Sequence, residues 1–149
     1  MSKITVMKIS VSDETGELES WDKTRLRKIA GTVLKNLGQH SQCELSVSFT
    51  DDRRMRELNR VWRNIDRTTD VLSFPQEGGP DYSLLGDIVI SIDTVKRQSK
   101  SYGNTVHEEI KKLLVHGILH LLGYDHKKKK EKDIMREQEA NLMFLTKDL

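Results

Sequence analysis

The chain contains only one cysteine, Cys43, so a disulfide within it is excluded and a cytoplasmic location is the default expectation. No apolar run is long enough to span a bilayer, and the first residues show no signal-peptide pattern. The net charge of +2 is too small to indicate nucleic-acid binding by itself. What remains is a chain of 149 residues, 36% hydrophobic and 32% charged, which predicts one globular domain over residues 1–149 and no membrane partner.

The pattern of apolar residues predicts an α+β fold with about four strands and five helices. Runs of β-branched or alternating apolar residues predict strands over residues 3–11, 43–49, 69–75 and 84–91. Pro75 should end the third of these or place it at a sheet edge. Helical spacing and capping signals predict helices over residues 21–37, 51–62, 93–101, 105–122 and 131–145. Asp51 is expected to cap the second helix, and Thr105 and Glu108 are expected to form a capping box, with reciprocal side chain to backbone bonds, at the start of the fourth. Residues 76–82, which include two glycines and a proline, are predicted to form a loop.

Two of the predicted helices should be amphipathic. In the second helix the apolar residues expected on one side are Met55, Leu58, Val61 and Trp62. In the last helix the residues expected to face inward are Ile134, Met135, Gln138, Leu142 and Leu145.

Three of the five histidines lie close together near the end of the fourth predicted helix. His116 and His120 are four residues apart, so their side chains should project from nearly the same face of a helix. Gly123 can end that helix in a left-handed conformation, and the reversed chain can then return His126 to the same point. Three imidazoles without a fourth protein ligand nearby are typical of a catalytic metal site with an open position.

The rest of this helix is almost entirely apolar, which predicts that it is central and buried. Burying two imidazoles is unfavourable unless their nitrogens find partners, and one metal ion satisfies both. The alternative is a pair of core histidines bonded to backbone carbonyls, but the third histidine after Gly123 favours the metal. His107 should lie out of phase with this cluster and serve the helix N-terminus instead.

The residue between the first two histidines argues against a peptidase. The spacing matches the metzincin pattern His-Glu-x2-His-x2-Gly-x2-His, but Gly117 stands where a metzincin has its general-base glutamate. Without a carboxylate there, amide hydrolysis would lose the group that carries a proton from water to the leaving amine. Gly117 also lowers helix stability by roughly 1 kcal/mol relative to alanine. We hypothesise that its missing side chain makes room for a substrate group or for another chain segment.

Three segments, in this order along the chain, resemble a known family. They are residues 58–75 (LNRVWRNIDRTTDVLSFP), 85–91 (LGDIVIS) and 116–126 (HGILHLLGYDH). Together they resemble the YbeY family of metal-dependent endoribonucleases, with Trp62 at a position where that family often has tyrosine. The resemblance covers residues 43–126, whereas the first 40 residues and the last helix agree only in length and pattern.

The resemblance implies a mixed four-stranded sheet packed with helices. It implies single-strand-specific endoribonuclease activity in maturation of ribosomal RNA, particularly the 3′ end of the small-subunit (16S) RNA, and in ribosome quality control. It also implies zinc held by His116, His120 and His126 and a functionally important arginine at Arg63. The implied partners are ribosomal RNA and the ribosome or small-subunit proteins.

Two residues near the histidines have both a functional and a structural interpretation. Arg63 can clamp a scissile phosphate through two N–H groups and stabilise its developing charge. The alternative is a surface arginine that pairs with Asp66 or Asp70. Asp125 can orient a ligating imidazole or act on the attacking water, but a turn in which its carboxylate accepts from backbone N–H groups is an equal alternative.

A run of positive charge follows the third histidine directly. Its members are Lys127, Lys128, Lys129 and Lys130. Such a run is usually the solvated start of a helix, although positive charge is unfavourable at a helix N-terminus. Beside an RNA-cleaving centre, binding of phosphates is the functional alternative.

These observations favour a metal-dependent endoribonuclease. The metal is expected to be zinc, with nickel as the alternative, because three imidazoles suit either ion. The group that accepts the proton of the attacking water stays unassigned, since position 117 holds glycine. One rival is a metzincin-like metallopeptidase, which Gly117 disfavours. The other is a ribosome-associated binding module in which the metal is structural.

Overall fold

The structure is a computed structural model that describes residues 7–39, 43–76 and 83–149. It confirms an α+β fold, with five helices and a mixed four-stranded sheet among the described residues. The strands are β1 (Lys8–Asp13), β2 (Cys43–Thr50), β3 (Val71–Pro75) and β4 (Ser83–Ser91). The helices are α1 (Ser20–Asn36), α2 (Asp52–Arg63), α3 (Ile92–Tyr102), α4 (Val106–Leu121) and α5 (Lys129–Leu145).

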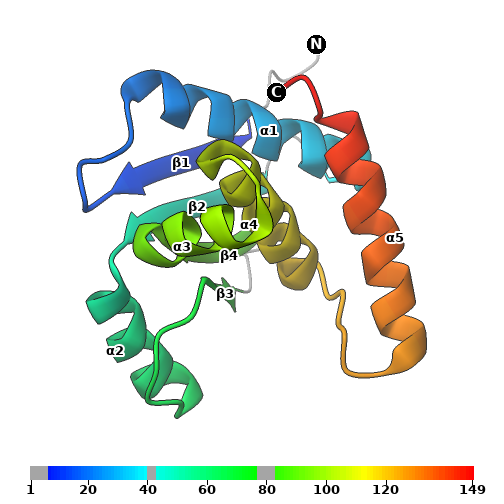
Figure 1. Cartoon of the computed structure of the whole chain (residues 1–149). Helices are drawn as coiled ribbons and strands as arrows, with labels where there is room; N and C mark the ends of the chain where they lie inside the picture. The colour runs from blue at the N-terminus through cyan, green and yellow to red at the C-terminus, as the bar shows by residue number, and fades with distance from the viewer. Residues whose placement is uncertain (1–6, 40–42, 77–82) are drawn as a thin grey trace.

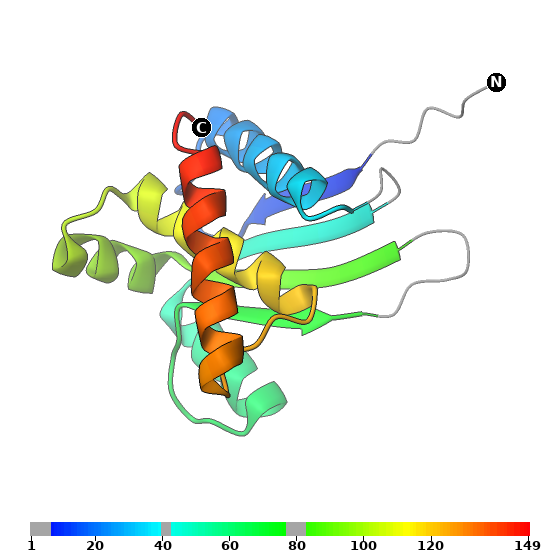
Figure 2. The ribbon, with the colours of Figure 1, turned by 90° about the vertical axis from the view of Figure 1, so that its right-hand side faces the viewer.

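The sheet has the strand order β1-β2-β4-β3. β1 pairs parallel to β2 and β2 parallel to β4, whereas β3 runs antiparallel to β4. β3 is therefore an edge strand and ends at Pro75, as this proline predicted, because it has no N–H to donate to a ladder. Figure 2 shows the strands side by side, with α1 at the β1 end of the sheet and α2 at the β3 end.

The two faces of the sheet carry separate apolar clusters. Side chains alternate along each strand, so neighbours on β4 such as Ile88 and Val89 point to opposite faces. Ile88 belongs to the larger cluster, which includes residues of α1, α4 and α5, and we call that side the first face. Val89 joins Met55 and Leu72 in a small cluster under α2, on what we call the second face. Figure 1 shows α4 crossing the sheet, with α2 at the lower left, away from α1 and α5.

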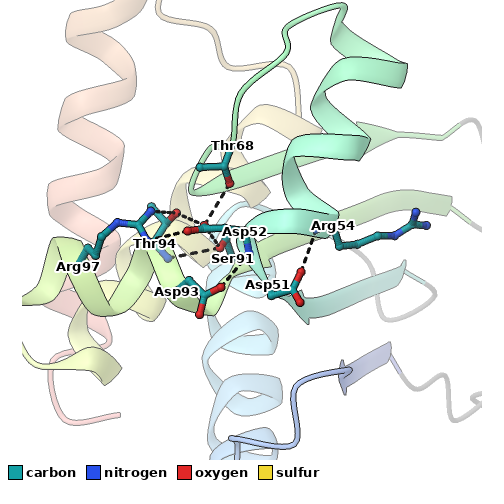
Figure 3. A network of polar contacts seen from close by, with 8 residues as sticks. All are labelled: Asp51, Asp52, Arg54, Thr68, Ser91, Asp93, Thr94 and Arg97. Carbon is teal, nitrogen blue, oxygen red and sulfur yellow. Dashed lines mark hydrogen bonds and ion pairs between the residues drawn. The ribbon is translucent and has the colours of Figure 1, made fainter.

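The N-terminus of α2 is held by a network of polar contacts (Figure 3). Asp51 caps the helix, as predicted, by accepting from the backbone N–H of Arg54 at 2.8 Å. The neighbouring carboxylate of Asp52 accepts from three hydroxyls and a guanidinium at 2.6–3.1 Å. These donors belong to Thr68, Ser91, Thr94 and Arg97. Because the donors come from β4, α3 and the segment before β3, the network fixes α2, and with it Arg63, against the sheet.

Several sequence-based boundaries and faces need correction. The first strand begins at Lys8, and residues 3–6 lie outside the described residues, as does most of the predicted loop at 76–82. α3 begins at Ile92 because the hydroxyl of Ser91 caps it, earlier than predicted. Thr105 does cap α4, but the Glu108 carboxylate accepts from its hydroxyl, so the predicted reciprocal backbone bond is replaced.

The predicted inward faces of α2 and α5 are wrong in part. Met55, Met135 and Leu142 are buried, but four of the other apolar residues are exposed. These are Val61, Trp62, Ile134 and Leu145. Helical spacing places them near the apolar side, but α2 and α5 lie at the margins of the fold, where no neighbour covers the whole apolar stripe. Within the described residues, no helix is both long and apolar enough to cross a membrane.

Candidate metal centre

Helix α4 places two histidines at its C-terminal end, beside the edge strand β3. Its apolar surface packs on the first face of the sheet and leaves His116 and His120 only partly buried. The two Nε2 atoms lie 3.1 Å apart, as the spacing of four residues predicted. The central helix of the fold is therefore the element that aligns the first two candidate ligands.

The chain reverses at Gly123 and brings the third histidine back. Gly123 has φ +95°, and its N–H donates to the carbonyl of His120, while the N–H of Tyr124 donates to that of Leu119. This pattern ends the helix in the way glycine permits and side chains resist. One ring nitrogen each from His116, His120 and His126 then lies within 4.8 Å of the others.

The donor set fits a zinc ion. With Zn–N bonds of 2.0–2.1 Å, tetrahedral ligand nitrogens lie about 3.4 Å apart, close to the 3.1 Å between His116 and His120. Burial, together with the neighbouring His116 and His126, lowers the pKa of His120. His120 is therefore neutral near pH 7, which is the ligand form of imidazole.

Glu139 is a residue of this site that the sequence pattern did not reveal. Its carboxylate lies 2.9 Å from Nδ1 of His116, and this hydrogen bond lowers the pKa of the Glu139 carboxyl. A donating Nδ1–H leaves the Nε2 lone pair of His116 directed toward the other histidines. Glu139 lies on α5, 23 residues beyond His116, so only the packing of α5 on α4 brings the two together. A lone glutamate on a charged helix carries no local signal of this role.

Arg63 borders the same cavity as the three histidines. A cavity of about 760 Å³ is bordered by Arg63, by the three histidines and by residues of β3. The Nη2 group of Arg63 donates to the Ser73 carbonyl at 2.8 Å, and the alternative interpretation, pairing with Asp66 or Asp70, is not observed among the described residues. Asp66 instead accepts from Arg56. The anchored guanidinium keeps further N–H groups for an anion.

Asp125 also borders the cavity, but its contact is with the backbone. Its carboxylate accepts from the N–H of His126 at 2.7 Å, as the turn interpretation predicted. This hydrogen bond lowers the pKa of the Asp125 carboxyl, so the group is an ionised and weakly basic carboxylate. Glu139, rather than Asp125, contacts the ring of His116.

The lysine run divides between the cavity and the helix that follows. Lys127 borders the cavity, whereas Lys128 is the N-cap residue of α5 and the next two lysines form its first turn. Their charge therefore lies at the unfavourable end of the helix dipole, as expected. His107 does not reach the cluster, as predicted. It lies in the first turn of α4, where its ring is 2.9 Å from the carbonyl of Leu149.

Comparison with known families agrees with this arrangement. The sequence model of the family described as Endoribonuclease YbeY matches residues 8–146. The chain belongs to this family. The resemblance found in residues 43–126 is thereby confirmed, and it extends over the first strand and the last helix.

Individual members of the YbeY family are similar to this chain over most of their length. "Endoribonuclease YbeY" of Aquifex aeolicus is 50% identical over 112 residues, which cover 74% of this chain and 74% of that protein. Its counterpart in a Sulfurihydrogenibium species is 44% identical and covers 85% of this chain and 79% of that protein. A solution structure from Thermotoga maritima shares the fold, with a TM-score of 0.56 and 24% identity over 96% of this chain and 93% of that one.

In this YbeY-family chain, Gly117 faces the sheet. A Cβ atom at this position would lie 3.0 Å from Ile88 Cδ1, 3.1 Å from Ile88 Cγ2 and 3.2 Å from Ser73 Oγ. The Ser73 hydroxyl also donates to the Gly117 carbonyl at 3.3 Å. Of the two hypotheses for this glycine, the structure supports close approach of another chain segment, not room for a substrate group. The missing side chain lets α4 lie against β3 and β4.

Proposed function

We propose that this chain is a metal-dependent, single-strand-specific endoribonuclease that acts in ribosomal RNA processing. The observation that carries the proposal is one open cavity bordered by three convergent imidazoles and an anchored arginine. Membership of a family of endoribonucleases supplies the substrate class. The finer assignment, cleavage near the 3′ end of the small-subunit 16S RNA and a part in ribosome quality control, follows the family resemblance.

The proposed cofactor is one zinc ion held by His116, His120 and His126, with nickel as the alternative. The ion would supply Lewis-acid polarisation of a phosphate or a water of lowered pKa. The support lies in the donors themselves: His120 is kept neutral, and the hydrogen bond from His116 to Glu139 fixes the orientation of its ring.

The other proposed roles fall to Arg63 and Asp125. Arg63 holds the scissile phosphate and stabilises the charge that develops on it, because its guanidinium is fixed by the Ser73 carbonyl and faces the cavity. Asp125 is the carboxylate of the turn that borders the cavity and is the candidate to receive a proton from water. Its lowered pKa makes it a weak base, so its contribution is expected to be smaller than that of Arg63.

The two rival functions are less well supported. A metzincin-like peptidase lacks its general base, and a carboxylate at Gly117 would be directed into the closely packed contact with Ile88 and Ser73. A binding module with a structural metal does not account for an arginine that shares an open cavity with the three histidines.

The setting of this activity is also part of the proposal. We propose that residues 1–149 form one domain, which the family match over residues 8–146 supports. A cytoplasmic location and the ribosome or its small-subunit proteins as partners fit a substrate that is ribosomal RNA.

The test is cleavage of single-stranded RNA by zinc-loaded protein and its variants. His116→Ala and Arg63→Ala should both lose cleavage while circular dichroism shows that they remain folded. His107→Ala is the matched control, because its ring contacts Leu149 and lies outside the cavity, and it should stay active. Equal cleavage by the first two variants would point to a contaminating nuclease and would refute the enzymatic proposal.

A further inference from the structure

A second cavity lies next to the metal centre, between α2 and the second face of the sheet. It has a volume of about 620 Å³, and its apolar walls are formed by Leu58, Trp62, Phe74 and Val89. We call it the second-face groove. It is large enough for a nucleoside, and Arg63 is the one residue with a proposed role in cleavage that borders it.

Trp62 is the prominent feature of this groove. Its side chain is 66% exposed, although tryptophan is normally among the more buried residues. Trp62 and Phe74 form an edge-to-face pair, with ring centroids 6.1 Å apart and an interplanar angle of 67°. An edge-to-face contact of this kind orients the indole while leaving much of its flat surface accessible. An oriented, exposed indole is suited to stacking against another flat group.

The groove adjoins the cavity of the metal centre at Arg63, Ser73 and Pro75, which border both. Of these, Arg63 has its guanidinium carbon 5.9 Å from the centre of the Phe74 ring. Its bond to the Ser73 carbonyl holds it at β3, the edge that separates the two faces of the sheet. An RNA strand that passes over this edge of the sheet can therefore place one phosphate at Arg63 and the adjacent base at Trp62.

The polar groups of the groove favour a base over a phosphate. Two carboxylates border it: Glu14 accepts from the Thr50 hydroxyl at 3.0 Å, and Asp87 accepts from the Gln76 amide at 2.6 Å. Carboxylates repel a phosphate but can accept hydrogen bonds from the amino groups of bases. Two arginines of α2, Arg54 and Arg63, border the groove as well, so the two carboxylates balance the two guanidinium charges. A lining with balanced charge suits a neutral ring better than a phosphate.

We propose that the second-face groove binds one unpaired base of the RNA strand that occupies the metal centre. The base stacks on Trp62, and its phosphate lies at Arg63. This inference rests on the proposed function, because it takes single-stranded RNA as the ligand. It also explains how such an enzyme selects single strands, since a paired base cannot leave its helix to enter the groove without losing its pairing.

The two tryptophans of the chain allow a direct test. A Trp21→Phe variant carries only Trp62, and a Trp62→Phe variant carries only Trp21, which lies on α1 and is 56% exposed. Each is titrated with a 2′-O-methyl oligonucleotide, which binds as a single strand but lacks the free 2′-hydroxyl. Base stacking should quench the fluorescence of Trp62 and leave that of Trp21 unchanged. Equal quenching of both, or of neither at saturation, would overturn the proposal.

Binding affinity provides the second measurement. Trp62→Ala should weaken binding of the same oligonucleotide about 5- to 150-fold, the range found for loss of one stacked base, and Trp62→Phe should recover much of it. Trp21→Ala, with a similarly exposed indole, should bind like the parent protein. Unchanged binding by Trp62→Ala would overturn the inference. The groove would then be a candidate binding site for a protein partner instead of a base.

The outcome is separable from that of the proposed function. If Trp62→Ala cleaves and binds normally, the groove inference fails and the nuclease stands. If the protein binds the oligonucleotide through Trp62 but never cleaves RNA with zinc, the nuclease fails and the base site stands.

Discussion

Substitution of Gly117 by alanine tests whether this glycine is needed for the packing of α4 on the sheet. The new methyl group would lie 3.0–3.2 Å from atoms of Ile88 and Ser73, closer than ordinary van der Waals contact. Ile88 is fully buried and cannot turn toward solvent, so either its rotamer or the position of α4 has to change.

The magnitude follows from two opposing effects. Alanine is favoured over glycine inside a helix by about 1 kcal/mol, whereas one extra methyl group in a filled core costs about 1–3 kcal/mol. The expected net loss for Gly117→Ala is therefore about 0–2 kcal/mol of unfolding free energy. Gly31 is the matched control: it lies inside α1, and among the described residues a Cβ there would meet only Ile9 Cδ1, at 3.7 Å. Gly31→Ala should gain about 1 kcal/mol.

The assay is urea denaturation of the metal-free protein, with m-values compared to confirm that both variants unfold from the same compact state. The informative quantity is the difference between the two variants, about 1–3 kcal/mol, because the gain from helix propensity is common to both. If Gly117→Ala stabilised the protein as much as Gly31→Ala, close packing would not be the reason for the glycine. That outcome would refute the explanation that close packing of α4 on the sheet disfavours a side chain at position 117.

Three further predictions concern the metal centre, the α2 network and the lysine run. Glu139→Gln should weaken zinc binding about 10- to 100-fold in a chelator competition, whereas Glu137→Gln on the exposed side of α5 should not. Burial raises the pKa of Asp52, but hydrogen bonds led by that of Arg97 outweigh it and bring the pKa from 3.8 to about 2. A depressed carboxyl pKa stabilises the fold above about pH 4, and this stability disappears as the pH falls toward 2. Asp52→Asn should therefore lose about 1–2 kcal/mol at pH 7 and much less at pH 2, while Asp66→Asn at an exposed ion pair should change little. Neutralising Lys127–Lys130 should weaken RNA binding and flatten its salt dependence, and an unchanged slope would count against phosphate contacts by the run.

The errors of the sequence-based prediction share a physical cause. Helical spacing reports which side of a helix is apolar, but not whether a neighbour covers that side. Trp62 was therefore expected to be buried and is instead exposed beside the second-face groove. The anchor of Arg63 was not foreseen either, because the residue pattern does not reveal that the backbone carbonyl of Ser73 accepts from its guanidinium.

The sequence by itself determined the elements of the fold and the three histidines, because spacing along one helix and a glycine-ended turn are local properties of the chain. It also excluded a glutamate base at 117 and identified the family. Only the tertiary structure decided that Glu139 orients His116, that Gly117 permits contact between α4 and β4, and that Arg63 lies between two cavities. These facts depend on segments far apart in the sequence that the sheet and the helix packing bring together, and no local pattern specifies them.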